Sequence, residues 1–199
     1  MSRRLLVLVA VAAAVLVAVP AALAAVRVHV RVEGKTQTIF GSTEPALSVQ
    51  ANALDALESA SLAGEFYYHV TTASFGVYVD QIGRYPASGS SGWVFKVNGV
   101  SPPVGADAVT LKPGDRVLWY WATFGPNGGP PTLVLRRASR GCYRVQAQDD
   151  AGKTSTARGA VLRVDGRLVR ARTGSACVGA HRGLVRATLK GAVRSNAVP

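Results

Sequence analysis

The side chains that most often perform chemistry in proteins are few and scattered in this sequence. His29 and His69 each lie in a strand pattern without a partner at a useful spacing, and His181 lies in an Arg/Gly-rich turn with no evident Ser or Cys partner. A metal site usually needs three or four His, Cys, Asp or Glu ligands. We therefore predict no metal site and expect His29 and His69 to be ordinary surface or half-buried residues.

A catalytic group is equally hard to assemble. Asp80 and Asp107 could act as an acid/base pair, but nothing in the sequence brings them together. A hydrolase would need a nucleophile–base pair or clustered carboxylates, and neither is evident. We expect a protein that is not an enzyme.

Cys142 and Cys177 are the only cysteines. The N-terminal residues 1–25, described below, have a signal-peptide pattern, and an even number of cysteines in an exported chain predicts a disulfide. Closing a loop of about 36 residues would restrict the unfolded chain by about 4 kcal/mol in the entropy model. The alternative is a redox pair, but the sequence has no Cys-x-x-Cys. The prediction is a structural bridge.

The net charge of +12 is unevenly distributed. Residues 26–131 have a net charge of −1, whereas residues 132–199 have a net charge of +11. Arginines at alternate strand positions could form a basic face that attracts anionic envelope polymers or lipid heads. The alternative is a solvated face that reflects only high genomic GC content, and both stay open. No nucleic-acid motif is recognisable, so we expect no nucleic-acid partner. The candidate basic face comprises Arg163, Arg167, Arg170 and Arg172.

The stretch from Gly92 to Trp121 contains all three tryptophans. Residues 93–97 are aromatic and β-branched, which favours a strand. Asn98-Gly99 predicts a tight hairpin turn because both residues tolerate positive φ. Residues 116–122 predict a strand whose two faces are both apolar, so part of the second face should be covered or bind something.

These motifs resemble the bacterial domain family related to the C-terminal domain of transcobalamin and intrinsic factor. The resemblance covers residues 26–125 and implies a β-grasp-like fold and a small ligand, with cobalamin as the candidate. This chain departs from the family pattern at Val109, near which the family usually has an aromatic residue. The candidate ligand contacts are Trp93, Tyr120 and Trp121. Exposure of any one of them beside a cleft would favour binding of a small ligand, and burial of all three would count against it. The matching residues are Gly92-Trp93-Val94-Phe95, Val97-Asn98-Gly99, Gly105-Ala106-Asp107, Leu111-Lys112-Pro113-Gly114-Asp115 and Trp119-Tyr120.

Periodicity indicates an α+β domain over residues 26–124. Residues 26–33 alternate strictly and predict a half-buried strand, followed by strands at 36–40, 65–70 and 75–82. Apolar spacing over 46–62 predicts one helix, with Ser48 as N-cap and Gly64 at its end. Four tyrosines could line a binding surface with Trp93 or simply pack the sheet. They are Tyr67, Tyr68, Tyr78 and Tyr85.

A Gly/Pro-rich linker at residues 125–131 separates this domain from residues 132–199. Short alternating runs with close turns, including Asp165-Gly166, predict a small all-β sandwich. Segments 141–145 and 185–188 resemble, more weakly, immunoglobulin-like and carboxypeptidase-regulatory-like modules. The predicted strands are 132–136, 142–148, 160–164, 168–171, 184–189 and 192–195.

Residues 1–25 have the pattern of a signal peptide, with Arg3-Arg4 before an apolar run and Ala22-Leu23-Ala24 at its end. We predict cleavage after Ala24 or Ala25. The alternative is an uncleaved membrane anchor, and twin-arginine export ranks second as a route.

Together these features predict an exported binding or interaction protein of the bacterial cell surface or extracellular space. Its partner would be an anionic envelope polymer or a surface protein. The alternative is a small-ligand binder of the cobalamin type.

Overall fold

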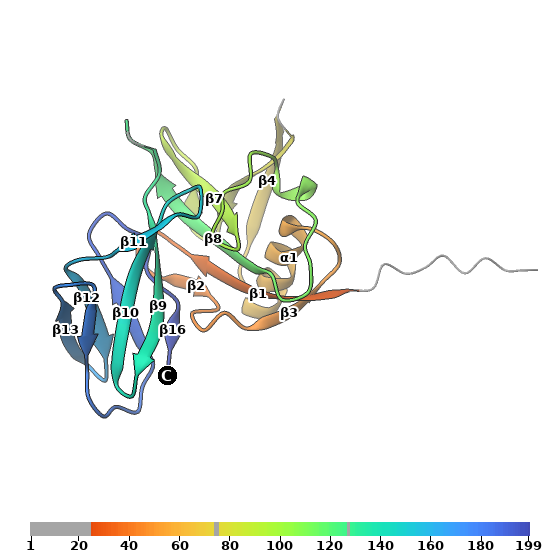
Figure 1. The fold of residues 1–199 in the computed structure, drawn as a ribbon. Coiled ribbons are helices and arrows are strands. Elements are labelled where there is room, and N and C mark those ends of the chain that lie inside the picture. Colours follow the sequence, from red (N-terminus) through yellow and green to blue (C-terminus); the bar gives the residue numbers. More distant parts are fainter. Residues whose placement is uncertain (1–24, 74–75, 127) are drawn as a thin grey trace, which may run out of the picture.

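The computed structural model describes residues 25–73, 76–126 and 128–199. The described chain is rich in strands and forms two regions that lie side by side (Figure 1). We call residues 25–126 the N-terminal region and residues 128–199 the C-terminal region. Each has its own hydrophobic cluster. The signal peptide predicted at 1–25 falls, except for Ala25, outside the described residues. No helix in the described part of the chain is long and apolar enough to cross a membrane.

The N-terminal region has one five-stranded sheet, one smaller sheet and a helix. The larger sheet has the order β2-β1-β8-β7, with β3 also paired to β1. Strands β1 and β8 are parallel, and their other pairings are antiparallel. The elements are β1 (Val26–Glu33), β2 (Thr38–Phe40), β3 (Ala46–Val49), α1 (Ala53–Gly64), β4 (Tyr68–Ala73), β5 (Gly76–Ile82), β6 (Tyr85–Pro86), β7 (Ser91–Val97), the short 3₁₀ turn η1 (Ala106–Ala108) and β8 (Arg116–Thr123).

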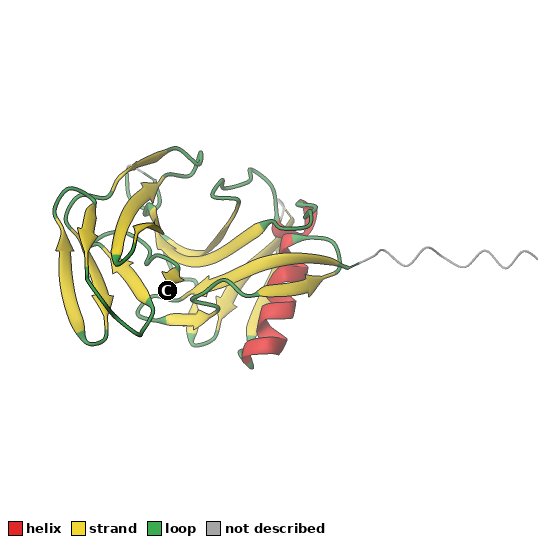
Figure 2. Ribbon diagram, turned by 60° about the horizontal axis from the view of Figure 1, so that its bottom comes forward, coloured by secondary structure: helices red, strands yellow, loops and turns green. Residues whose placement is uncertain are grey.

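Helix α1 packs across one face of this sheet (Figure 2). Alternation along β1 places Val28, Val30 and Val32 on that face, where all three are fully buried. The β-rich architecture with one helix among the described residues agrees with the sequence analysis. The finer β-grasp assignment stays a prediction.

The predicted start of the helix was wrong, whereas Gly64 ends it as predicted. Residues Ala46–Val49 form a strand paired with β1, and α1 begins only after Asn52. Asn52 accepts a hydrogen bond from the Asp55 backbone N–H, and the Asp55 carboxylate accepts one from the Asn52 N–H. This capping box satisfies two backbone donors at the helix start, so Asn52 rather than Ser48 is the N-cap. At the other end, Glu65 takes the left-handed conformation after Gly64.

The predicted tight turns are confirmed. Asn98 and Gly99 have φ values of 52° and 87°, and Val97 pairs with Val100 across the turn. Positive φ at both central positions is typical of a type I′ turn. Asp165 and Gly166 repeat this geometry, with φ values of 47° and 74°.

The C-terminal region consists of two four-stranded sheets around an apolar cluster. In one sheet, β10 pairs with each of the other three strands, β9, β11 and β14. The other sheet has the order β13-β12-β15-β16. The strand predicted at residues 192–195 is absent, and residues 197–198 form the strand that pairs with β15 instead. The sequence analysis did not predict the short strands at residues 154–156 and 175–177. The elements are β9 (Thr132–Ser139), β10 (Cys142–Gln148), β11 (Thr154–Thr156), β12 (Ala160–Val164), β13 (Arg167–Ala171), β14 (Ser175–Cys177), β15 (Val185–Thr188) and β16 (Ala197–Val198).

Cys142 and Cys177 form the predicted disulfide. They lie directly opposite each other on β10 and β14. The bridge therefore joins the first residue of β10 to the last residue of the short strand β14 and fastens one end of that sheet. No free cysteine occurs in the described residues.

The two regions meet at the second face of the larger N-terminal sheet. Leu118, Tyr120 and Ala122 of β8 form an apolar cluster there with Val193 of the C-terminal region. Arg31 and Glu33, two of the polar residues of β1, are buried on the same face. The expectation that the second face of β8 is covered is therefore met, and the cover is the C-terminal region itself.

Candidate functional site

An apolar cleft of about 420 Å³ lies beside β7, the last strand of the larger N-terminal sheet. Strand β5, loop 101–106, strand β8 and Asp150 of the C-terminal region complete its lining. We call it the β7 cleft. Its main apolar and aromatic lining residues are Tyr78, Trp93, Phe95, Val104, Trp119 and Tyr120.

The aromatic lining is held in place by strand register and hydrogen bonds. Phe95 pairs with Trp119 across β7 and β8, and their rings stack with centroids 5.0 Å apart. Trp93 Nε1 donates to Tyr85 O at 2.8 Å, and Trp119 Nε1 donates to Ala53 O at 3.2 Å. Because both indole N–H groups are satisfied away from the cleft, the small part of each ring that borders it is apolar; Trp93 and Trp119 are each 2% exposed.

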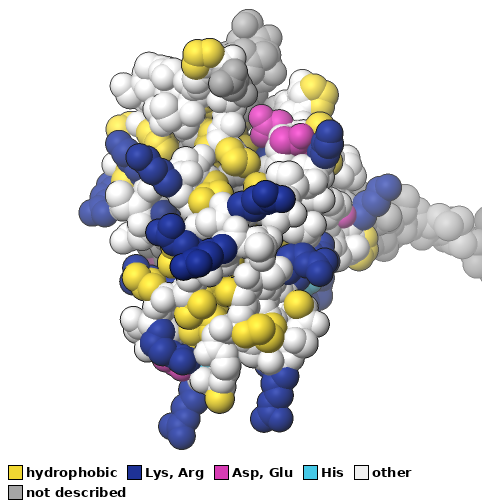
Figure 3. Space-filling view, turned by 60° about the vertical axis from the view of Figure 1, so that its left-hand side comes forward, with side chains coloured by type: hydrophobic (Ala, Val, Ile, Leu, Met, Phe, Trp, Pro, Cys, Tyr) yellow, Lys and Arg dark blue, Asp and Glu magenta, His cyan; other side chains and the backbone are white. Residues whose placement is uncertain are grey.

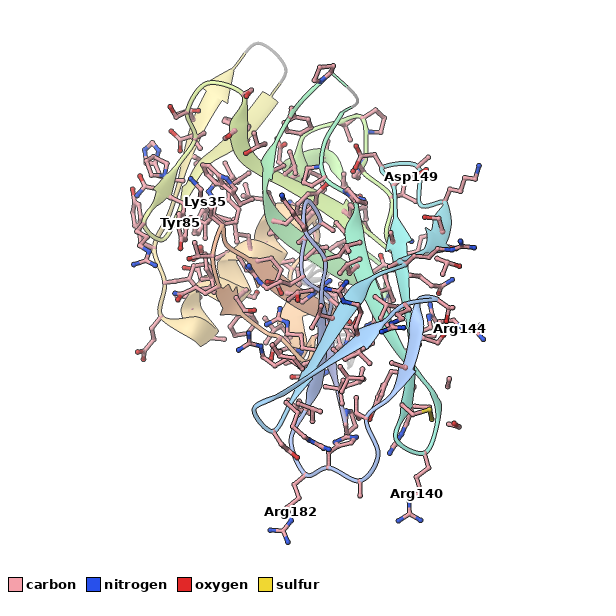
Figure 4. The ribbon with its side chains drawn as sticks, turned by 90° about the vertical axis from the view of Figure 1, so that its left-hand side faces the viewer. Lys35, Tyr85, Arg140, Arg144, Asp149 and Arg182 are labelled. Atoms are coloured by element: carbon pink, nitrogen blue, oxygen red, sulfur yellow. A yellow bond between two sulfur atoms is a disulfide. The ribbon has the colours of Figure 1, made fainter. Side chains whose placement is uncertain are left out.

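One end of the cleft is polar, and both regions contribute to it. Asp150 Oδ1 accepts hydrogen bonds from Ser101 Oγ at 3.2 Å and from Tyr120 Oη at 3.4 Å. Lys96 Nζ lies 3.3 Å from the same oxygen. The turn that carries Asp149, and with it Asp150, lies beside the N-terminal strands (Figure 4). The cleft therefore combines an apolar body with a carboxylate at one end.

Lys96 joins the two regions from inside the interface. Its side chain is fully buried, and Nζ donates to Asp149 O at 2.8 Å and to Gln148 O at 3.2 Å. The ammonium also lies 5.7 Å from the centre of the Tyr120 ring, within range of a cation–π contact. Burial lowers the pKa of Lys96, and the charge of Asp150 opposes that shift.

Tyr120 is a hydrogen-bond donor in this environment and does not ionise near neutral pH. Burial raises its pKa well above the usual value, and the negative charge of Asp150 raises it further. A phenol that keeps its proton can orient a carboxylate or a ligand but does not act as a base. The polar end of the β7 cleft therefore contains a protonated phenol whose O–H donates to Asp150.

The structure brings two of the three predicted ligand contacts to this cleft. Trp93 and Tyr120 both line it, although each is only 2% exposed. Trp121 lies elsewhere: its half-buried ring contacts Tyr85 and Trp93 on the helix face of the sheet. Of the four tyrosines considered, Tyr78 lines the cleft, whereas Tyr67 is exposed.

Sequence reasoning missed Lys96, Val104 and Asp150. The signal for Lys96 was its position inside an otherwise apolar strand, where a lysine is rarely buried without partners. Asp150 lies in a turn of the other region, and no local pattern connects it to Lys96. Only the packing of the two regions makes them neighbours.

The four arginines of the candidate basic face do not share one face. Arg163 and Arg170 lie on the outer face of their sheet, opposite Leu168 and Val161. Arg167 has the opposite parity on β13 and donates to Ala180 O at 3.1 Å, and Arg172 follows the strand as an exposed residue. On the surface in Figure 3, Lys and Arg side chains are spread among other residue types.

The three histidines have structural partners. His69 Nδ1 lies 2.7 Å from Asp80 Oδ1, while Asp107 is an exposed residue of η1. His29 Nδ1 contacts Glu44 O at 2.8 Å, and His181 Nε2 contacts Tyr143 Oη at 2.7 Å. Within the described ranges, no group of three or more His, Cys, Asp or Glu residues could hold a metal ion.

Comparison with known proteins gives a family match and distant structural matches. A family model described as a domain of unknown function (DUF4430) matches residues 50–123, which include α1, β5, β7 and β8. A solved structure titled as a "putative metal binding protein from Ruminococcus gnavus" is 17% identical, with a TM-score of 0.37, over 48% of this chain and 95% of that chain. So low a structural similarity carries no argument about a ligand. No curated protein matches the chain.

Proposed function

We propose that this is an exported, non-enzymatic binding protein that holds a small apolar or amphipathic ligand in the β7 cleft. The observation that carries the proposal is the preformed aromatic lining with a single carboxylate at one end. The volume of the β7 cleft, about 420 Å³, falls within the range of about 300–1,000 Å³ usual for small-molecule sites. Such sites are mostly apolar and contain a few polar groups that orient the ligand.

The lining defines the chemistry of the ligand. An apolar body would contact Phe95, Val104 and Trp119, and a hydrogen-bond donor on the ligand would face Asp150. The Asp150 side chain is 49% exposed, so it can accept a further hydrogen bond without being desolvated. A ligand with an apolar ring or chain and one hydroxyl or amine group fits this arrangement.

Export and the lack of enzymatic activity are parts of the proposal that rest on separate observations. The signal-peptide pattern and the disulfide between Cys142 and Cys177 support an oxidising compartment outside the cytosol. The lining of the cleft contains one carboxylate, that of Asp150, and no histidine or cysteine, which favours binding over catalysis. Cobalamin is larger than this cleft and would fit only in part, so we include it as a test compound rather than as the expected ligand.

The test is a fluorescence titration of the mature protein with N-phenylnaphthylamine, an uncharged apolar probe, followed by competition with candidate ligands including cobalamin. Trp93 and Trp119 line the cleft, so we expect saturable energy transfer to the probe. Absorption by cobalamin is corrected with free tryptophan.

Val104→Asp is the informative variant, because Val104 lines the cleft and is 50% exposed. Leu184→Asp is the matched control, since Leu184 is 47% exposed and lies in the C-terminal region away from the cleft. Placing a carboxylate against an apolar ligand should weaken binding by about tenfold or more. Equal probe binding by the two variants would contradict the proposal.

A further inference from the structure

A second cavity, of about 170 Å³, lies between the two regions and is lined by basic side chains. Arg31, Lys96 and Arg116 line it from the N-terminal region, together with the single carboxylate of Glu44. Arg136 of β9 lines it from the C-terminal region. We call it the arginine cavity. It is distinct from the β7 cleft, and Lys96 is the residue whose interactions connect the two.

The positive charge around this cavity exceeds the negative charge. Lys96 is already satisfied by Asp150 and by main-chain oxygens. The Glu33 carboxylate forms ion pairs with Arg31, Arg186 and Arg194. The Glu44 carboxylate forms ion pairs with both Arg31 and Arg116. Four guanidinium groups thus share two carboxylates, and they are Arg31, Arg116, Arg186 and Arg194.

Arg31 has an unsatisfied donor at this buried position. The residue is 3% exposed, and its Nε is among the buried side-chain atoms without a hydrogen-bond partner in the described part of the chain. Nε lies 3.2 Å from Glu44 Oε1, which is an ion-pair distance but lacks hydrogen-bond alignment. Buried donors are rarely left unpaired because their desolvation is not repaid. A further acceptor in the cavity would resolve this.

Arg136, unlike Arg31, lacks a counter-ion among the residues that the structure describes. It lies directly opposite Arg144 on β10, and like charges directly opposite on neighbouring strands repel each other. Arg144 projects from the surface in Figure 4. Arg136 forms no ion pair with any residue that the structure describes. Arg116 is close enough to be affected: burial lowers its pKa, and the charges of Arg31 and Arg136 lower it further.

We propose that the arginine cavity binds a phosphate group, with Arg31 and Arg116 on one side and Arg136 on the other. The planar guanidinium fork matches the oxygen geometry of phosphate, and its charge-assisted hydrogen bonds are strong. The ligand neutralises the excess charge, gives Arg31 an acceptor and relieves the repulsion around Arg136. Because its contacts come from both regions, it also fastens them together.

The test is calorimetric titration of the full mature chain with inorganic phosphate, with thermal denaturation at constant ionic strength as a second measurement. We expect saturable binding and a rise in melting temperature that chloride does not reproduce. Arg136→Gln should weaken phosphate binding by about tenfold, the effect of losing one charge-assisted contact. Both Arg136 and its neighbour Arg137 are exposed, so neither substitution disturbs a core.

Arg137→Gln is the matched control, because Arg137 is the next residue on β9 and lines other hollows rather than the arginine cavity. The proposal is wrong if phosphate acts no differently from chloride, or if the two variants bind it equally well. Competition by glycerol phosphate would identify the phosphate group of a larger molecule as the ligand, and its failure to compete would identify the free ion. Val104→Asp should leave phosphate binding unchanged, which separates this site from the β7 cleft.

Discussion

The two faces of the larger N-terminal sheet are both buried, but one buries apolar side chains and the other also buries charged ones. The face toward α1 is apolar and includes Val30 and Trp119, with α1 and loop residues covering it. The face toward the C-terminal region buries Arg31, Glu33 and Lys96. The two sets of side chains alternate along the same strands. Alternation along a strand therefore identified two faces but did not tell which of them meets solvent.

The apolar face and the charged face contribute differently to the stability of the protein and to the docking of its two regions. Apolar burial stabilises in proportion to area and tolerates small shifts. Buried charges stabilise little net, because desolvation opposes the attraction, but they strongly penalise any arrangement that leaves one of them unpaired. We infer that the helix face supplies most of the stability of the N-terminal region. The charged face determines how the C-terminal region docks.

The largest expected effect is on the apolar face. Trp119→Ala should lower the free energy of unfolding by about 4 kcal/mol, because it removes a buried aromatic ring and leaves a cavity. Chemical denaturation of the mature protein measures this. Trp121→Ala is the comparison, since Trp121 is only half-buried on the same face, and its cost should be smaller. A smaller loss for Trp119→Ala than for Trp121→Ala would contradict the importance of the helix face.

Glu33→Gln should have the next largest effect and tests the charged face. Its carboxylate pairs with Arg31, Arg186 and Arg194. Removing that charge leaves three guanidinium groups with less compensation, so the free energy of unfolding should fall by about 3 kcal/mol. Glu65→Gln, at an exposed position, provides the control in the same denaturation measurement. If both variants unfold alike, the Glu33 cluster does not hold the two regions together.

Much of the local structure could be predicted from the sequence. Tight turns such as Asn98-Gly99 depend on two adjacent residues, and strands such as residues 142–148 depend on short alternating patterns. The disulfide followed from composition and compartment. The boundary of α1 was wrong because Ala46–Val49 has apolar spacing compatible with either a strand or a helix. Pairing with β1 made it a strand.

The candidate sites were predictable only in part. Trp93 and Tyr120 lie in one motif-rich stretch, so the resemblance could point to them. Asp150 and Arg136 come from the other region, and their distances to Lys96 and Arg116 depend on how the two regions dock. The excess of arginine was visible from composition, but the sequence located it on an outer sheet face. The structure instead buries Arg186 and Arg194 partly at the interface.

Lys96→Met sharpens the comparison with a smaller change. Methionine retains the apolar stem of lysine and removes the ammonium that donates to Asp149 O and Gln148 O. We expect a loss of about 1–2 kcal/mol in the free energy of unfolding, since these acceptors lose their donor but Asp150 can be solvated. Lys112→Met, at an exposed position, controls for loss of a surface charge. A stabilised Lys96→Met protein would show that the ammonium is retained for docking or function rather than for stability.

The smallest expected effect is a pH dependence on the charged face. The folded-state pKa of Tyr120 is raised above its unfolded value by burial and then by Asp150. Its contribution to stability is therefore fully present below about pH 10, the ordinary pKa of tyrosine, and is lost as pH rises toward the folded-state value, because the unfolded chain releases the proton first. Tyr120→Phe should unfold less steeply with rising pH in that alkaline range, measured by denaturation at several pH values. Tyr67→Phe changes an exposed ring and should keep the slope of the unmodified protein. An unchanged slope in Tyr120→Phe would mean that water reaches the phenol and that the interface is open at this point.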